Sequence, residues 1–308
     1  MKLITHILIF SFLSVCVYSQ EKNLAELLGY PKDAKLLIIH ADDAAVSHST
    51  NQAIFDAFEK GNISSTAIMV PCPWFPEMAA YASKHPDLDF GLHLTLNAEW
   101  NTYKWGSVAS ANKVTSLLTN EGYLYSTTKQ AADSAKASEA ETELRAQIEK
   151  AIASGIQPSH FDTHMNTVVQ NVDLLKVYIK LGEEYKVPIL LAKDQPYTKE
   201  MLEIPEMKNQ YFIDSIIEAK TEVDPAKWKE NYTSILQNLK PGIQELILHL
   251  AYYNEETIAM TEGFEFYDAK WRKRDVDFIN NDEFKKILKD NNISVITWKQ
   301  IQAAIYHK

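Results

Sequence analysis

Cysteine is nearly absent from this 308-residue sequence, which contains only Cys16 and Cys72. If the N-terminal segment is removed on export, as argued below, a single cysteine remains and no intramolecular disulfide can form. Stability must then come from a buried core, which a chain of this length can build. No Gly/Ser-rich linker, heptad pattern or repeat of fixed period divides the chain. We therefore expect one folded domain over residues 20–308.

Long basic runs are also missing. The sequence has 31 Lys and Arg residues against 41 Asp and Glu residues, which gives a formal net charge of -10. Non-specific binding to nucleic acid requires many positive charges to neutralise phosphates, so nucleic acid is excluded as a partner. Hydrophobic residues make up 46% and charged residues 23%, a composition typical of globular proteins rather than of disordered or collagen-like chains.

The most hydrophobic segment lies at the N-terminus. Lys2 precedes a mostly apolar stretch over residues 3–17, and small residues stand at the positions expected before a cleavage at Gln20. This pattern predicts a signal peptide over residues 1–19 and an exported protein, either periplasmic or secreted. The apolar stretch is short for a membrane span, so we expect no stable membrane insertion. The alternative is a lipoprotein anchored at Cys16.

Short runs rich in Ile, Leu and Val alternate with helix-like segments along the rest of the chain. Strands buried on both faces have this composition, and their alternation with helices is typical of a parallel α/β barrel. The fold class we expect is a distorted parallel (β/α) TIM-like barrel in a single domain. The predicted strands are residues 36–41, 63–69, 89–96, 158–163, 187–192, 210–215, 245–250 and 293–297.

The helices are predicted from apolar spacing and capping residues. One should begin at a cap formed by Ser49 or Thr50 and stop at Gly61, and another should be capped by Asp224. The helix capped by Asp224 covers residues 225–239, and the remaining predicted ranges are residues 138–153, 172–185 and 282–290. Residues 97–137 are polar and have little periodicity, which indicates a functional excursion over one face of the barrel.

Histidines and aspartates gather at the ends of four predicted strands. They are His40, Asp42, Asp43, His93, His160, Asp162, His164 and His249. In a parallel barrel the carboxyl ends of the strands meet at one face, where active sites form. Burying so many titratable groups is costly unless they are paired or bind a metal. Two imidazoles and one carboxylate form a facial site for a divalent ion, and a second carboxylate can serve as a general base.

These residues resemble the YdjC-like carbohydrate deacetylases, a chitooligosaccharide deacetylase-like family related to the polysaccharide deacetylases. The resemblance covers residues 35–300. It is carried, in order, by Ala41-Asp42-Asp43, Asn51, the stretch 61–66, Gly91-Leu92-His93-Leu94, the stretch 160–164, the stretch 245–249 and Trp271-Arg272-x-Arg274-Asp275.

The resemblance implies a hydrolase that removes N-acetyl groups from an oligosaccharide containing amino sugars. It implies that Asp43, His93 and His164 hold one divalent ion, Zn2+ or Mg2+. Asp42 would be the general base toward metal-activated water, and His249 would protonate the leaving amine. We expect His160 and Asp162 to orient the metal ligands or to have a purely structural role.

Three positions depart from the family pattern. Ala44-Ala45 follows the aspartate pair where the family usually has Phe-Gly, which changes the wall beside the site. Met165 and Asn166 follow His164 where further histidines are frequent, and Asn166 cannot titrate. Leu250 follows His249 where a proline is frequent. None of these departures removes a predicted metal ligand.

Aromatic residues near the strand ends are candidates for a sugar platform, because aromatic faces pack on the apolar faces of sugars. The predicted substrate contacts are Trp100, Trp105, Tyr252, Trp271 and Arg274, although core packing or salt bridging explains the same residues. Two alternative functions also stay open. One is a non-catalytic sugar-binding barrel, and the other is a non-haem iron enzyme with the same two-His, one-Asp ligand set.

Overall fold

The computed structural model describes residues 23–306. The predicted signal peptide, its cleavage site before Gln20 and the alternative anchor at Cys16 lie outside the described residues. None of the helices in the described part of the chain combines the length and the apolar character needed to cross a lipid bilayer.

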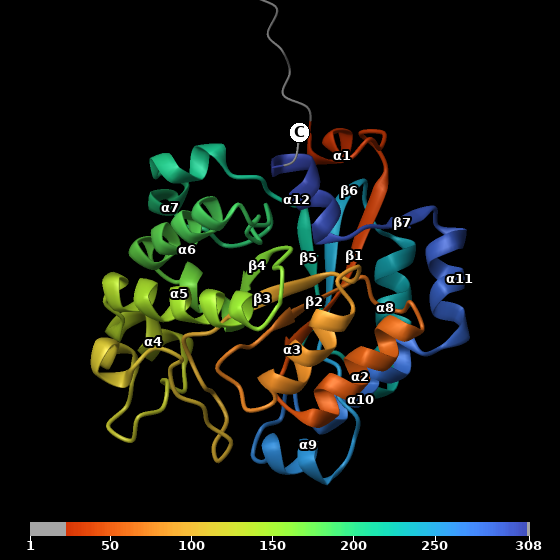
Figure 1. Ribbon diagram of the computed structural model, residues 1–308. Helices are drawn as coiled ribbons and strands as arrows, with labels where there is room; N and C mark the ends of the chain where they lie inside the picture. The colour runs from red at the N-terminus through yellow and green to blue at the C-terminus, as the bar shows by residue number, and fades with distance from the viewer. Residues whose placement is uncertain (1–22, 307–308) are drawn as a thin grey trace, which may run out of the picture.

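A parallel sheet lies at the centre of the molecule (Figure 1), and its strand order is β4-β3-β2-β1-β6-β5, with β7 paired to the start of β1. Every strand pair is parallel. The strands are β1 (Lys35–Ala44), β2 (Ser65–Ile68), β3 (Phe90–Leu94), β4 (Phe161–Thr163), β5 (Ser215–Ile217), β6 (Gly242–Leu248) and β7 (Ile293–Val295).

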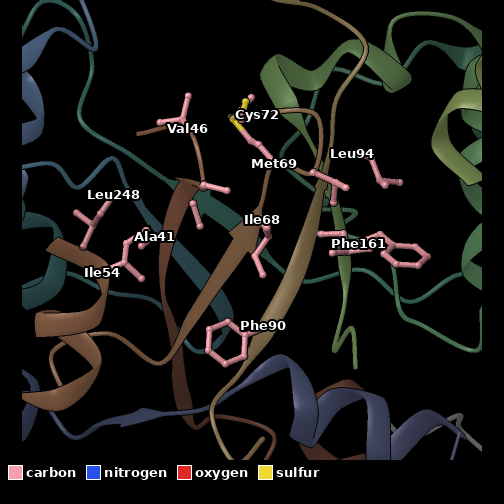
Figure 2. Close-up of a cluster of buried hydrophobic side chains, with 14 of the residues drawn as sticks. Ala41, Val46, Ile54, Ile68, Met69, Cys72, Phe90, Leu94, Phe161 and Leu248 are labelled. Atoms are coloured by element: carbon pink, nitrogen blue, oxygen red, sulfur yellow. Dashed lines mark hydrogen bonds between the residues drawn. The ribbon is translucent and has the colours of Figure 1, made fainter. Parts of the chain in front are cut away.

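β1 occupies the middle of the sheet. Its residues 36–39 are at most 2% exposed, as expected of an apolar run that has a strand on each side. Figure 2 shows part of this core, in which Ala41 of β1, Ile68 of β2 and Phe161 of β4 contribute side chains to one apolar cluster. Leu36 and Ile38 of β1 belong instead to a second, smaller cluster with Trp298, so β1 contributes to both parts of the core.

Isolated bridges extend the sheet toward closure. Phe161 on β4 pairs with Ile189, and Ala192 pairs with Ile213 just before β5. Residues 189–192 therefore stand where a further strand would close the ring between β4 and β5. The distorted parallel barrel expected from the sequence is confirmed in this form.

Two strand predictions need correction. The predicted strand 187–192 is reduced to these bridges, because it contains Pro188, which has no N–H to donate to a ladder. The predicted strand 210–215 begins too early, since the ladder with β6 starts only at Ser215. Just before it, the Asp214 carboxylate accepts a hydrogen bond from the backbone N–H of Ile243, so a side chain replaces one ladder contact.

Helices surround the sheet, with α5 and α6 beside β3 and β4, and α2, α8, α10 and α11 on the opposite side (Figure 1). They are α1 (Leu24–Leu27), α2 (His48–Glu59), α3 (Phe75–Lys84), α4 (Thr128–Ser134), α5 (Ala137–Ala153), α6 (Val172–Tyr185), α7 (Lys199–Glu203), α8 (Trp228–Gln237), α9 (Glu255–Met260), α10 (Ala269–Ile279), α11 (Asp282–Asp290) and α12 (Trp298–Tyr306).

The helix ends follow local capping chemistry. Ser47, and not Ser49 or Thr50, caps α2, because its hydroxyl accepts a hydrogen bond from the backbone N–H of Thr50. Asp224 is a cap as predicted, but it caps a single 3-10 turn over Pro225–Lys227 that precedes α8. The predicted helix 225–239 is therefore a 3-10 turn followed by a shorter α-helix.

The predicted excursion at residues 97–137 runs from β3 to α5 through two 3-10 turns and the short helix α4. It is fastened to α5, since the buried Glu143 carboxylate accepts hydrogen bonds from the backbone N–H groups of Val108 and Ala109. This segment carries Glu99 and Trp100 to the barrel face described next.

Candidate active site

A cavity of about 400 Å³ opens at the carboxyl ends of the strands, a volume within the range of about 300–1,000 Å³ usual for small-molecule sites. Five strands lead into it and supply polar side chains at or just past their ends. The lining includes Asp42, Asp43, His93, Asp162, His164, Glu218, His249 and Arg272, with Trp100, Phe264, Phe266 and Tyr267 among its aromatic residues.

A local distortion of β1 brings both aspartates to this cavity. Successive side chains of a regular strand point to opposite faces, so neighbours do not normally reach the same space. Here Asp43 has a φ of 62° and Ala45 a φ of 78°, and the pairing with β2 shifts register between Ala41 and Ala44. The side-chain oxygen of the buried Asn51 accepts a hydrogen bond from the Ala45 N–H at 2.7 Å and holds this bend.

Asp43, His93 and His164 form a compact group that fits a metal ion. Asp43 Oδ1 lies 3.7 Å from His93 Nε2 and 3.4 Å from His164 Nδ1, and one ligand atom from each residue falls within 4.8 Å of the others. The same Asp43 Oδ1 is buried and has no hydrogen-bond partner. An uncompensated carboxylate oxygen facing two imidazoles is what a bound divalent cation would satisfy.

Each of the three side chains is held by a second group on its far side. His93 Nδ1 lies 2.7 Å from Asp162 Oδ1, and His164 Nε2 lies 2.8 Å from Glu99 Oε2. Arg272 donates to Asp43 Oδ2 at 2.6 Å. Carboxylates behind ligating histidines fix the tautomer and the ring orientation in metal sites. Here they leave one nitrogen of each ring free to face Asp43.

Asp42 stands beside this group. Its Oδ1 lies 3.1 Å from His40 Nε2, and its Oδ2 lies 3.8 Å from His249 Nε2. Burial by itself would raise the pKa of Asp42, but the charges of His93 and His40 outweigh burial and lower the pKa. Asp42 is therefore ionised at neutral pH, as a proton acceptor must be.

His249 follows β6 and faces Asp42 across the cavity. Burial lowers the pKa of His249 to about 4, against the opposing charges of Asp43 and Asp42. The ring is therefore neutral at pH 7. Its backbone N–H donates to Asp275 at 2.9 Å, which fixes the chain at this strand end.

A second polar layer lies beneath the cavity. The fully buried His40 contacts Asp42, Asp162 and Glu245, and these carboxylates outweigh desolvation and raise its pKa well above the usual value. His160 is also fully buried; its ring stacks on Trp298 and its Nδ1 lies 2.9 Å from Ser159 Oγ. Asp162 thus contacts the candidate ligand His93 directly, whereas His160 sits one layer further from the cavity.

Most of the predicted substrate contacts lie elsewhere. Trp100 lines the cavity, but the other four predicted residues do not, and the structure corrects them. Trp105 is buried and donates to the carbonyl of Asn97, Tyr252 bonds Asp56, Trp271 packs on Trp228, and the Arg274 guanidinium lies 4.6 Å over the Trp228 ring. Each has its polar or aromatic face taken by a structural partner.

The aromatic wall is formed instead by Phe264, Phe266 and Tyr267, which connect α9 to α10. Sequence reasoning missed these residues and also Glu99 and Glu218. Glu218 directly follows β5, so the strand-end argument would have found it had β5 been placed correctly. Glu99 lies in the non-periodic excursion and gives no comparable signal.

The departures from the family pattern are also visible here. Ala44 and Ala45 are fully buried and do not line the cavity, whereas Met165 and Asn166 line it with φ angles of 51° and 57°. Leu250, next to His249, is fully buried.

The chain is similar in sequence to known carbohydrate deacetylases. The chain is 28% identical to a carbohydrate deacetylase of Thermoanaerobacter pseudethanolicus, over 84% of this chain and 96% of that protein. It is 27% identical to a carbohydrate deacetylase of Brevibacillus brevis, over 86% of this chain and 99% of the relative.

A crystal structure from Enterococcus faecalis, of a protein assigned provisionally to cellobiose-phosphate cleavage, has the same fold. It superposes with a TM-score of 0.73 at 24% identity and covers 87% of this chain and 99% of that one. The family model described as YdjC-like protein matches residues 36–290, which include every strand from β2 to β6 and all of the cavity-lining side chains named above. The chain therefore belongs to the YdjC-like family.

Proposed function

We propose that this protein is a metal-dependent carbohydrate deacetylase that removes N-acetyl groups from an oligosaccharide containing amino sugars. The observation that carries the proposal is that one cavity holds both a candidate metal site and a candidate general base. The unpartnered Asp43 Oδ1 faces His93 and His164, and a second ionised carboxylate, Asp42, stands beside them. A sugar-binding protein would need no such base.

The residues have separate roles in amide hydrolysis. Asp43, His93 and His164 would hold a divalent ion, which when bound supplies Lewis-acid activation of water and of the amide carbonyl. Asp42 takes a proton from the water while the water oxygen attacks the carbonyl carbon. The carbon–nitrogen bond then breaks, and the nitrogen must receive a proton to leave as an amine.

His249 is the candidate donor of that proton. Because its pKa is lowered to about 4, it does not bring a proton of its own at pH 7. Its Nε2 lies 3.8 Å from Asp42 Oδ2, so we propose that it passes on the proton that Asp42 has collected. Phe264, Phe266 and Tyr267 provide the aromatic wall against which a sugar ring can pack.

The types of ligand indicate which metal ion the site would prefer. Two imidazoles and one carboxylate favour zinc or another transition ion over magnesium, since magnesium prefers oxygen ligands. Zinc is therefore the ion we propose to test first.

The decisive experiment measures acetate release from N-acetylated chitooligosaccharides by the purified, zinc-loaded protein. Asp42→Asn should lose most turnover and keep stoichiometric zinc, whereas His164→Ala should lose both. Asp133→Asn, an exposed surface carboxylate on α4, is the matched control and should change neither. Turnover unchanged in Asp42→Asn would refute the assignment of the base. Turnover that requires oxygen would favour the iron-enzyme alternative.

We also propose that the protein is exported after cleavage before Gln20, on the basis of the N-terminal sequence pattern. The N-terminal sequence of the protein recovered from the periplasm or the medium tests this directly. Recovery of the intact chain from the cytoplasm would contradict it, and acylation at Cys16 would favour the lipoprotein alternative.

A further inference from the structure

Carboxylates are prominent among the side chains that line the cavity. Five carboxylates face it, and they belong to Asp42, Asp43, Glu99, Asp162 and Glu218. Among the lining residues in the described part of the chain, Arg272 is the only Lys or Arg. Nearby histidines with raised pKa values offset much of this charge in the metal-free protein, and a bound divalent ion would do so in their place, so discrimination between charged ligands depends on whichever carboxylate has no such partner.

Arg272 offers little to an anionic ligand. Its Nη2 donates to Asp43 at 2.6 Å, its Nε donates to the Tyr267 carbonyl at 2.9 Å, and its guanidinium lies 5.4 Å over the Trp100 ring. The remaining Nη1 has no partner but is itself buried. A phosphate could reach this nitrogen only by displacing the groups packed around it.

Glu218 differs from the other four carboxylates. Asp43 pairs with Arg272, Glu99 with His164, and Asp42 and Asp162 both contact His40. Within the described residues, Glu218 forms no salt bridge, and its side chain is only partly open to solvent where it lines the cavity at the end of β5. Its carboxylate is therefore available to a ligand that already contacts the metal centre.

We propose that Glu218 is a specificity-determining residue that selects substrates by charge. It favours an oligosaccharide that carries a free amino group on a sugar unit besides the acetylated one, and it disfavours phosphorylated or carboxylated sugars. The naming of the substrate as a partly deacetylated amino-sugar oligosaccharide rests on the function proposed above. The charge preference itself rests on the position of Glu218 in the cavity and on its lack of a salt bridge.

The physical basis is electrostatic complementarity, which discriminates between ligands more strongly than it raises affinity. Burial and the neighbouring charge of Asp42 raise the pKa of Glu218 to about 7 in the free protein. An ammonium group on the ligand favours the ionised carboxylate and offsets that shift. An anionic group on the ligand disfavours the ionised form of Glu218 and is repelled by that form, because no neighbouring cation pairs with this carboxylate.

Calorimetric titration of the zinc-loaded full chain at pH 7 tests the proposal with three disaccharides of similar size. They are the disaccharide of glucosamine with both amino groups free, neutral cellobiose, and cellobiose 6-phosphate. We expect the amino sugar to bind at least tenfold more tightly than the phosphate, with cellobiose between them. Glu218→Gln should narrow that difference by about tenfold or more, and Glu222→Gln, an exposed carboxylate outside the cavity, should leave it unchanged.

Three outcomes overturn the proposal. They are equal or preferred binding of the phosphate, a preference for the amino sugar that persists unchanged in Glu218→Gln, and no binding of any of the three ligands. A persistent preference would assign the amine to the metal centre instead. None of the three disaccharides carries an acetyl group, so failure of the deacetylase assay and failure of this test are read independently.

Discussion

The two carboxylate oxygens of Asp43 face different partners. Oδ2 is taken by Arg272, and Oδ1 is left facing His93 and His164. This division depends on groups that are not themselves candidate ligands. At the scale of single residues, we expect such supporting groups to control how tightly the site binds a metal ion.

Glu99→Gln tests one of them. The change removes the charge that holds His164 Nε2 but keeps the size of the side chain. The His164 ring should therefore turn more freely and be a weaker metal ligand. We expect zinc affinity to fall about 10- to 100-fold, the usual cost of losing such a partner, as measured by chelator competition. Glu121→Gln, an exposed carboxylate in the same excursion, should leave affinity unchanged. Unaltered affinity in Glu99→Gln would show that this contact does not support the site.

Gly91 tests the packing under the site. A Cβ atom at this position would lie 2.2 Å from the His160 ring, and the ring is wedged against Trp298 and His40. Gly91→Ala should lower the free energy of unfolding by about 1–3 kcal/mol, as overpacking does, measured in urea. Combined with His160→Ala, which removes the clashing ring, the added cost of Gly91→Ala should largely disappear. Additive effects would mean that the clash lies elsewhere.

At the scale of elements, the salt bridge between Arg272 and Asp43 joins α10 to the end of β1. Both side chains are nearly fully buried, and breaking such a pair leaves an uncompensated charge. The packing of α10 against the barrel and the shape of the candidate site are thereby linked.

Arg272→Met should destabilise the metal-free protein by about 3–5 kcal/mol at pH 7, measured by urea unfolding with a chelator present. The double variant with Asp43→Asn should be much less affected than the sum of the single variants. Arg272 and His164 outweigh burial and hold the folded pKa of Asp43 well below its usual 3.8. The pair therefore stabilises fully above about pH 4, and its contribution falls as the pH drops further. A difference between wild type and Arg272→Met that grows at acid pH would contradict this.

At the scale of the whole molecule, metal binding and folding are coupled. The candidate ligands come from three separate strand ends, on β1, β3 and β4, so the unfolded chain cannot present them together. An ion that binds only the folded state stabilises it by an amount that grows with the logarithm of the free ion concentration relative to its Kd.

Zinc should therefore raise the unfolding temperature, with about 2.7 kcal/mol of stabilisation when the free metal is 100-fold above its Kd. Thermal unfolding followed by circular dichroism measures this, and a chelator should reverse it. His164→Ala should show almost no response, whereas Asp42→Asn should respond as wild type does. An equal response in His164→Ala would place the metal at another site.

The sequence itself determined much of the architecture, because apolar runs and capping residues are local signals. The helix at 172–185 and the one at 282–290 were predicted at their observed bounds. β1, β3 and β6 were recognisable as apolar runs ending in polar residues, which also pointed to Asp42, Asp43, His93 and His249. β5 was misplaced, and the strand predicted at 187–192 was reduced to isolated bridges, because short ladders at the edge of a distorted barrel depend on pairing partners distant in sequence.

Only the tertiary structure decided what those residues face. No local pattern predicts that Asp43 adopts a positive φ, that Arg272 arrives from α10 to occupy one of its oxygens, or that Glu99 reaches His164 from a non-periodic excursion. The same is true of the sugar platform, since aromatic residue type does not reveal whether a ring is open to the cavity or packed on Trp228. Strand ends fix which residues can meet, whereas packing between distant segments fixes their orientation and charge.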